Sequence, residues 1–266
     1  MEYRLNREQQ ALLCKLARQA GTAIMGIYNT VGDIAVDWKE DSSPLTEADR
    51  ASHHCIAAGL SEHFPDIPVL SEEGGEISWE ERSRWEMFFL VDPLDGTKEF
   101  INKNGEFTVN IALIIGSTPV FGVVFVPAQE QLYAGGPEYG SWLETAAQTV
   151  RKLEVPVGSE KECWNVVASR SHPSPDLARF LERLPSYNQL PFGSSLKFCR
   201  VADGSADYYP RFGPTMEWDT AAGHAVLIGA GGQVVDPGSV PLRYNKESLL
   251  NPIFLATGPP WKGEWA

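Results

Sequence analysis

The sequence has few of the residues that build soft-metal centres or disulfide frameworks. Its 266 residues include four cysteines and five histidines, with no CxxC pair and no HExxH arrangement. Scattered cysteines in a chain of this length are typical of reduced core residues. The composition therefore disfavours a metal centre built from nitrogen and sulfur ligands.

The sequence also lacks a long apolar run, and its first residues do not have the pattern of a secretory signal. No stretch approaches the roughly 20 apolar residues that cross a bilayer, and the first residues carry an acid and lack an apolar segment. We therefore expect a cytoplasmic protein. The sequence leaves open a peripheral contact with the cytoplasmic face of the inner membrane, and whether the protein is a monomer or a homodimer.

Positive charge is scarce as well. Lysine and arginine number 22 against 35 aspartates and glutamates, which gives a net charge of -13. A nucleic acid polymer would need the opposite sign. A small anionic substrate could still bind if divalent cations offset the repulsion locally. The alternative is that the acidic surface only keeps the protein soluble.

The apolar pattern predicts an α+β fold of mixed and antiparallel sheets covered by helices. Helical spacing is found over residues 6–28, with Asn6 as N-cap, and after Thr46 up to residue 62. Strands are expected at 33–39, 67–70, 87–91, 107–115, 120–126, 131–134, 141–144, 164–168 and 232–235, and further helices at 175–184, 195–203 and 218–228. We expect an N-terminal α+β domain over 1–150, carrying most metal ligands, and a C-terminal α/β domain over 151–266 that completes the substrate site.

The most informative segment is DPLDGT, residues 92–97, directly after the strand expected at 87–91. A tight turn there, with Pro93 fixing one φ angle, would aim Asp92 and Asp95 at one point. Magnesium prefers such oxygen ligands. A helix beginning near Gly96 would present free amides to a phosphate. Alternatively, the two carboxylates only hold backbone amides of a capped turn.

Two more acidic segments follow apolar residues, at SEE (71–73) and WDTAAG (218–223). A carboxylate at a helix start is often only an N-cap, and this is the alternative role for Asp219. Of Glu72 and Glu73 we expect one to be a ligand, because neighbouring side chains point in different directions. Glu73 is then a surface charge.

Together, the three motifs resemble the inositol monophosphatase superfamily of lithium-sensitive, magnesium-dependent phosphomonoesterases, over nearly the whole chain. The stretches GSSLKFC (193–199) and ADYYPRFGPT (206–215) are most similar to bacterial 3'(2'),5'-bisphosphate nucleotidases. The resemblance implies an αβαβα layered sandwich of the sugar-phosphatase type. It also implies conversion of adenosine 3',5'-bisphosphate to AMP and phosphate, in sulfur metabolism, with two or three magnesium ions per chain.

The resemblance assigns roles to matching positions. Asp92 matches a carboxylate shared between two metals, and the other metal ligands are Glu72, the carbonyl of Leu94, Asp95 and Asp219. Thr97 matches the hydroxyl that positions the attacking water, and Asp49 matches its carboxylate partner. From the residues alone, Asp49 would be an exposed helical residue. The implied substrate contacts are Glu72, Leu94, Asp95, Gly96, Thr97, Ser195, Lys197, Arg211 and Asp219.

Several of these contacts have plain alternatives. Ser195 could simply cap the helix that follows it, and Lys197 could lie on a solvated face. Arg211 could pair with a second phosphate, and Tyr209 could pack near a base. Glu217 could touch a sugar hydroxyl or face solvent.

Two other functions stay open from sequence. One is an inositol monophosphatase or related sugar phosphatase of the same superfamily. The other is a non-catalytic sensor that keeps an anion or nucleotide site, which the presence of every expected ligand disfavours.

Overall fold

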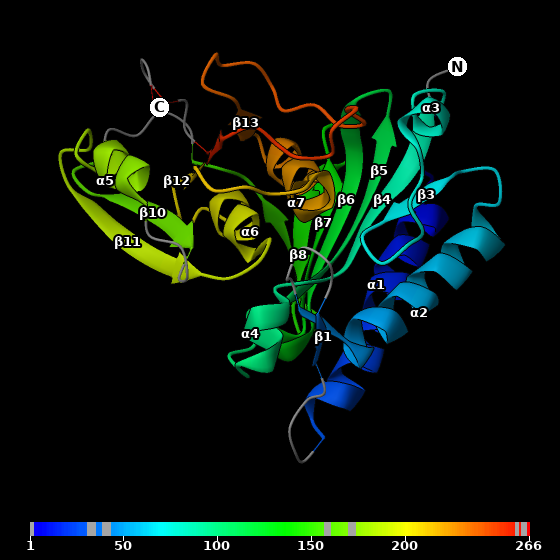
Figure 1. The fold of residues 1–266 in the computed structure, drawn as a ribbon. Helices are drawn as coiled ribbons and strands as arrows, with labels where there is room; N and C mark the ends of the chain where they lie inside the picture. The colour runs from blue at the N-terminus through cyan, green and yellow to red at the C-terminus, as the bar shows by residue number, and fades with distance from the viewer. Residues whose placement is uncertain are drawn as a thin grey trace.

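The computed structural model describes residues 3–30, 36–38, 44–156, 161–169, 174–258, 261 and 265–266. Its layers alternate in the order helix, sheet, helix, sheet, helix (Figure 1). The predicted layered α+β fold is therefore confirmed. Of the strand expected at 33–39, only β1 (Val36–Trp38) is described, and it pairs with β2 (Pro44–Thr46). His172, one of the five histidines that form no metal-binding pattern in the sequence, also lies outside the described residues.

Helices α1 (Arg7–Tyr28) and α2 (Glu47–His63) form the first layer, at the predicted positions. Asn6 begins α1 in a capping box with Gln9, and Thr46 begins α2 in a capping box with Asp49. Side-chain and backbone groups satisfy one another in both boxes, which fixes where each helix starts. The apolar faces of both helices pack on the larger sheet.

The larger sheet has seven strands in the order β3-β4-β5-β6-β7-β8-β9. Only its first pair, β3 with β4, is parallel, and the other neighbours are antiparallel. The strands are β3 (Val69–Ser71), β4 (Met87–Asp95), β5 (Thr108–Ile115), β6 (Thr118–Val126), β7 (Gln131–Gly136), β8 (Gly140–Glu144) and β9 (Val150–Leu153). Short helices α3 (Trp79–Arg82), α4 (Thr97–Ile101) and η1 (Pro127–Gln129) lie in its connections.

The DPLD segment is the end of β4 and not a tight turn, which corrects the sequence prediction. Asp92 pairs with Asn110 of β5 and Asp95 pairs with Thr108, so β4 carries one extra residue between them. Residues three apart on a regular strand face opposite sides of the sheet, and one inserted residue returns Asp95 to the side of Asp92. Pro93, which lacks an N–H, lies in the unpaired bulge where none is needed.

Helices α6 (Leu196–Ala202) and α7 (Glu217–Gly229) form the middle layer. Helix α7 lies directly on β6 because Gly122 has no side chain, and a Cβ there would be 2.3 Å from the carbonyl oxygen of Ala222. The second sheet has the order β11-β10-β12-β14-β13, and α5 (Pro175–Leu181) packs on its outer face. Its strands are β10 (Trp164–Ser169), β11 (Tyr187–Phe192), β12 (Tyr208–Arg211), β13 (Gln233–Val235) and β14 (Phe254–Thr257).

The two sheets share one core, because the cluster around α6 and α7 takes side chains from both. Strand β9 crosses the predicted boundary at residue 150 and completes the first sheet. The division into two domains stays a prediction. Among the described residues, no helix is both long enough and apolar enough to span a membrane.

Candidate active site

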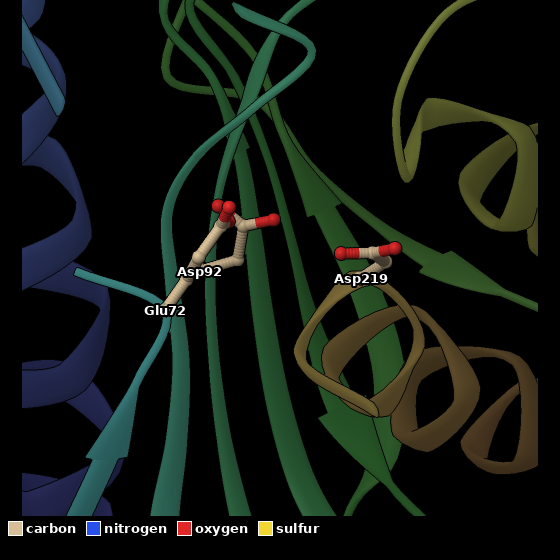
Figure 2. A group of neighbouring side chains, drawn as sticks. All are labelled: Glu72, Asp92 and Asp219. Carbon is tan, nitrogen blue, oxygen red and sulfur yellow. The ribbon is translucent and has the colours of Figure 1, made fainter. Parts of the chain in front are cut away.

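Three carboxylates from distant segments meet where β3 and β4 end (Figure 2). The carboxyl ends of these strands share one edge because the pair is parallel, and the N–H of Glu72 donates to the carbonyl oxygen of Val91. Asp219 faces Glu72 and Asp92 from the first turn of α7. Each carboxylate offers an oxygen within 4.8 Å of those of the other two.

This cluster concentrates negative charge in a buried place. Asp92 is 1% exposed. Burial raises its pKa well above the usual range, and the neighbouring carboxylates Glu72, Asp95, Asp219 and Asp49 raise it further. Burial likewise raises the pKa of Asp219, with Asp95 and Glu72 adding to the effect. The charged neighbours that raise the pKa of Asp92 are carboxylates, and Oδ1 of Asp92 accepts from the backbone N–H of Leu94 at 3.0 Å. The negative charge gathered here therefore calls for a cation from outside the chain.

The donor set fits a hard divalent cation. Carboxylate oxygens are the ligands that magnesium and calcium take, and nitrogen or sulfur ligands are not among the clustered side chains. Leu94 lies beside the cluster on the bulge of β4, because its N–H donates to Oδ1 of Asp92 at 3.0 Å. Its carbonyl oxygen is 3.5 Å from the hydroxyl of Thr97. The structure therefore brings together Glu72, Asp92 and Asp219, with Leu94 beside them.

Asp95 is adjacent to this group and not a member of it. Its Oδ2 accepts from the backbone N–H of Ser195 at 2.6 Å, and lies 2.8 Å from the Ser195 hydroxyl and 3.5 Å from the amide of Asn110. One oxygen of Asp95 is thus surrounded by donors of the chain itself.

Thr97 and Asp49 are brought together although they lie on different helices. The hydroxyl of Thr97 is 3.3 Å from Oδ1 of Asp49, whose Oδ2 accepts from the N–H and the hydroxyl of Thr46 at 2.8 and 2.6 Å. Asp49 is 2% exposed, so the alternative of an exposed helical residue is wrong. The pKa of Asp49 is raised overall: burial is the largest cause and Glu73 adds to it, while the hydrogen bonds from Thr46 work in the opposite direction.

A cavity of about 130 Å³ opens beside Asp95 and Asp219. Gly96 borders it at the start of α4 with a φ of +92°, the left-handed conformation that favours glycine. Lys197 also lines it and is 5% exposed, so the solvated-face alternative is wrong. Burial lowers the pKa of Lys197 to about 8, while Asp95 works in the opposite direction. Its ammonium donates to the carbonyl of Ser194 at 2.7 Å.

Arg211 lines the same cavity, at the end of β12. Its Nη2 donates to the carbonyl of Pro214 at 2.9 Å, and its buried Nε has no hydrogen-bond partner within the described parts of the chain. Tyr209 is 3% exposed and packs edge-on against Phe198 and Phe254. It therefore belongs to the core and only borders the cavity.

Two alternatives from sequence are corrected by hydrogen bonds. Ser195 occupies the N-cap position of α6, but its side chain makes no capping bond. Glu217 touches neither solvent nor the cavity. It is fully buried and accepts from the N–H groups of Asn245 and Lys246 and from the Lys246 ammonium, at 2.6, 2.9 and 2.5 Å.

Sequence reasoning missed several polar residues of the site, among them Ser194, Glu99 and Asn110. Ser194 lines the cavity with a φ of +46°, and Glu99 lines it from α4. Asn110 is fully buried opposite Asp92 in the register of β5. The buried asparagine in an otherwise apolar strand was a usable signal, whereas nothing in the sequence distinguishes Glu99 from a surface charge.

Known proteins resemble this chain over most of its length. The model of the inositol monophosphatase family matches residues 5–254. The 3'(2'),5'-bisphosphate nucleotidase CysQ of Escherichia coli (strain K12) is 49% identical over 243 residues, which is 91% of this chain and 96% of that protein. The corresponding CysQ of Buchnera aphidicola is 43% identical over 248 residues, covering 92% of each.

Solved structures agree with these matches. CysQ from Bacteroides thetaiotaomicron superposes with a TM-score of 0.83 at 40% identity, covering 94% of this chain and 97% of that one. SuhB from Bartonella henselae gives a TM-score of 0.75 at 25% identity, covering 93% of this chain and 92% of that one. With the layered fold and the clustered carboxylates, these matches show that the chain belongs to the inositol monophosphatase family.

Proposed function

We propose that the chain is a magnesium-dependent phosphomonoesterase, a 3'(2'),5'-bisphosphate nucleotidase that converts adenosine 3',5'-bisphosphate to AMP and phosphate. The observation that carries this is the buried group of Glu72, Asp92 and Asp219 next to a cavity that holds Lys197 and Arg211. An acidic metal site beside cationic side chains suits a phosphate ester. The CysQ relatives are named for this activity.

Magnesium would be held by Glu72, Asp92, Asp95, Asp219 and the carbonyl of Leu94. When bound, it supplies positive charge that stabilises phosphate oxygens and makes water more acidic. We propose two ions per chain, with a third near Glu72. The raised pKa values of Asp92 and Asp219 support at least one cation, because ionised neighbours need compensation.

Thr97 and Asp49 would prepare the attacking water. In this proposal the hydroxyl of Thr97 donates its proton to Asp49 rather than to the carbonyl of Leu94, which leaves the lone pairs of the hydroxyl oxygen to accept a hydrogen bond from water. A proton released by the water can pass through the hydroxyl to Asp49, whose raised pKa favours accepting it. The amides of Gly96 and Thr97 would hold phosphate oxygens. No covalent phosphoenzyme is needed.

The cavity dimensions suit recognition of one phosphate rather than of a whole nucleotide. About 130 Å³ is smaller than the roughly 300 Å³ at which typical ligand pockets begin. We propose that Lys197 and Arg211 hold the second phosphate there, while the nucleoside extends outside. The cytoplasmic location and lithium sensitivity stay predictions from sequence.

Phosphate release from adenosine 3',5'-bisphosphate and from inositol 1-phosphate tests the proposal. At equal concentrations with magnesium, we expect a kcat/KM at least about 100-fold higher for the nucleotide, since two charged contacts are lost with inositol phosphate. A preference for inositol 1-phosphate would make the chain a sugar phosphatase of the same family. Nucleotide binding without turnover, and without dependence on magnesium, would indicate a sensor.

A further inference from the structure

Ser195 lies at the N-cap position of α6 and does not do what a serine there usually does. An N-cap hydroxyl accepts from a backbone N–H of the first turn. Ser195 makes no such bond, and its φ and ψ of -66° and -6° are helical rather than extended. It is also 2% exposed, so its hydroxyl is not turned to solvent.

The hydroxyl is instead directed at three other elements. Its Oγ lies 2.8 Å from Oδ2 of Asp95 at the end of β4, 2.6 Å from the carbonyl oxygen of Asp219 on α7, and 3.0 Å from the amide nitrogen of Asn110 on β5. The amide of Asn110 donates to Oγ, and the single Ser195 proton is shared between the two acceptors. Ser194, and not Ser195, borders the cavity.

These contacts fix how Asp95 can bind a cation. The backbone N–H of Ser195, its hydroxyl and the Asn110 amide all face Oδ2 of Asp95. Because these contacts hold Oδ2, they set the orientation of the whole carboxylate group. Groups that hydrogen-bond a metal-binding carboxylate set its orientation and typically change metal affinity 10–100-fold when removed.

We propose that Ser195 is a positioning residue that fixes the carboxylate of Asp95 and holds it in register with Asp219, with Asn110 as its support. This inference rests on the proposed metal site. It assigns Ser195 to the ligands rather than to the substrate. Because Ser195 touches β4, β5 and α7 at once, it joins ligands that are more than a hundred residues apart in sequence.

The test uses Ser195→Ala, which removes one oxygen atom and keeps the backbone N–H. Magnesium binding is measured by isothermal titration calorimetry on the full chain, and kcat and KM are measured across magnesium concentrations. We expect magnesium affinity to fall about tenfold or more. The kcat should recover as magnesium is raised, and the KM for nucleotide at saturating magnesium should stay within about twofold of wild type.

Three further variants sharpen the comparison. Ser195→Thr keeps the hydroxyl and should restore most of the magnesium affinity, whereas Asn110→Ala should weaken it in the same direction as Ser195→Ala. Ser205→Ala is the matched control, because this exposed serine follows the other end of α6 and its hydroxyl bonds the carbonyl of Arg200 and the carboxylate of Asp203, away from the acidic cluster. It should leave all three measurements unchanged.

A Ser195→Ala protein that binds magnesium like wild type but has a raised KM would overturn the inference and make Ser195 a substrate contact. A wild-type chain that binds no magnesium and releases no phosphate would instead refute the proposed function. Thermal unfolding in EDTA checks that each variant is folded. If Ser195→Ala is unfolded, Asn110→Ala decides the matter, and unchanged magnesium affinity there would equally count against the positioning role.

Discussion

At the residue scale, Asp92 shows how function opposes stability. It is buried, and the charges of Glu72, Asp95, Asp219 and Asp49 raise its pKa. In the absence of a cation, an ionised Asp92 therefore destabilises the fold. The sequence motif predicted a metal ligand at this position. The burial of Asp92 explains why a neutral side chain there would make the metal-free protein more stable.

Asp92→Asn should accordingly raise stability while nearly abolishing turnover. In EDTA at pH 8 we expect the free energy of unfolding to increase by roughly 1–2 kcal/mol, because the raised pKa means that ionisation is unfavourable in the folded state. Turnover with magnesium should fall by at least about 10²–10³-fold. Chemical denaturation and phosphate release measure the two effects, and an active variant would exclude the ligand role.

Lys197 should make kcat/KM fall on the alkaline side of its pH profile, which we call the basic limb. Its pKa of about 8 means that the free enzyme loses this positive charge as pH rises through 8. Since a protonated lysine attracts the phosphate, kcat/KM should fall above that pH by up to tenfold for each unit. Lys197→Gln should have a low kcat/KM without this limb. An unchanged limb in the variant would assign it to another group.

At the element scale, one carboxylate serves both a helix start and the proposed water site. Asp49 closes the capping box of α2 and accepts from Thr97 of α4. Asp49→Ala should therefore lower the free energy of unfolding by about 1 kcal/mol and also lower turnover. Thr97→Ala should lower turnover alone, with magnesium affinity kept. Denaturation measures the change in stability, and calorimetry measures magnesium affinity in both variants. Lost magnesium affinity in Thr97→Ala would contradict the division of roles between Thr97 and the metal ligands.

Elements with strong periodicity were predictable, and those set by tertiary partners were not. The helix after Asn6 and the strands 108–115 and 118–126 follow directly from apolar spacing. Strand β11, with the letters YNQLPF, has no such pattern and forms because it pairs with β10. The bulge in β4 depends on pairing with β5, so the sequence suggested a turn instead.

The site divides in the same way. Motif residues such as Asp92 and Asp219 could be named from sequence, because their chemistry is carried by residue type and order. The role of Ser195 could not be predicted from sequence, since a serine before a helix normally indicates an N-cap. The buried position of Glu217 could not be predicted either, because its hydrogen-bond donors at 245 and 246 come from a distant loop.

At the scale of the whole molecule, a buried histidine couples stability to pH. His224 on α7 is 2% exposed and bonds the Tyr244 hydroxyl through Nδ1 at 2.9 Å. Burial lowers its pKa to about 3, with Arg243 adding to the effect. Between pH 6.5 and 3 the unfolded chain binds a proton that the folded chain does not, so stability falls as pH drops.

Because of His224, the free energy of unfolding should fall by about 2 kcal/mol between pH 8 and pH 5. His224→Gln, which does not titrate, should lack that share of the pH dependence. Urea denaturation of both proteins at the two pH values gives the difference. Equal pH dependence in wild type and variant would show that His224 is not the group responsible.

The proposed site exists only in the complete fold, since its ligands come from the residue after β3, from β4 and from α7. A crystal of the full chain soaked in manganese, measured for anomalous scattering, tests this most directly. We predict at least one anomalous peak bonded to carboxylate oxygens of Asp92 and of Glu72 or Asp219. Manganese bound elsewhere, with this acidic group empty in a protein that still hydrolyses substrate, would contradict the account.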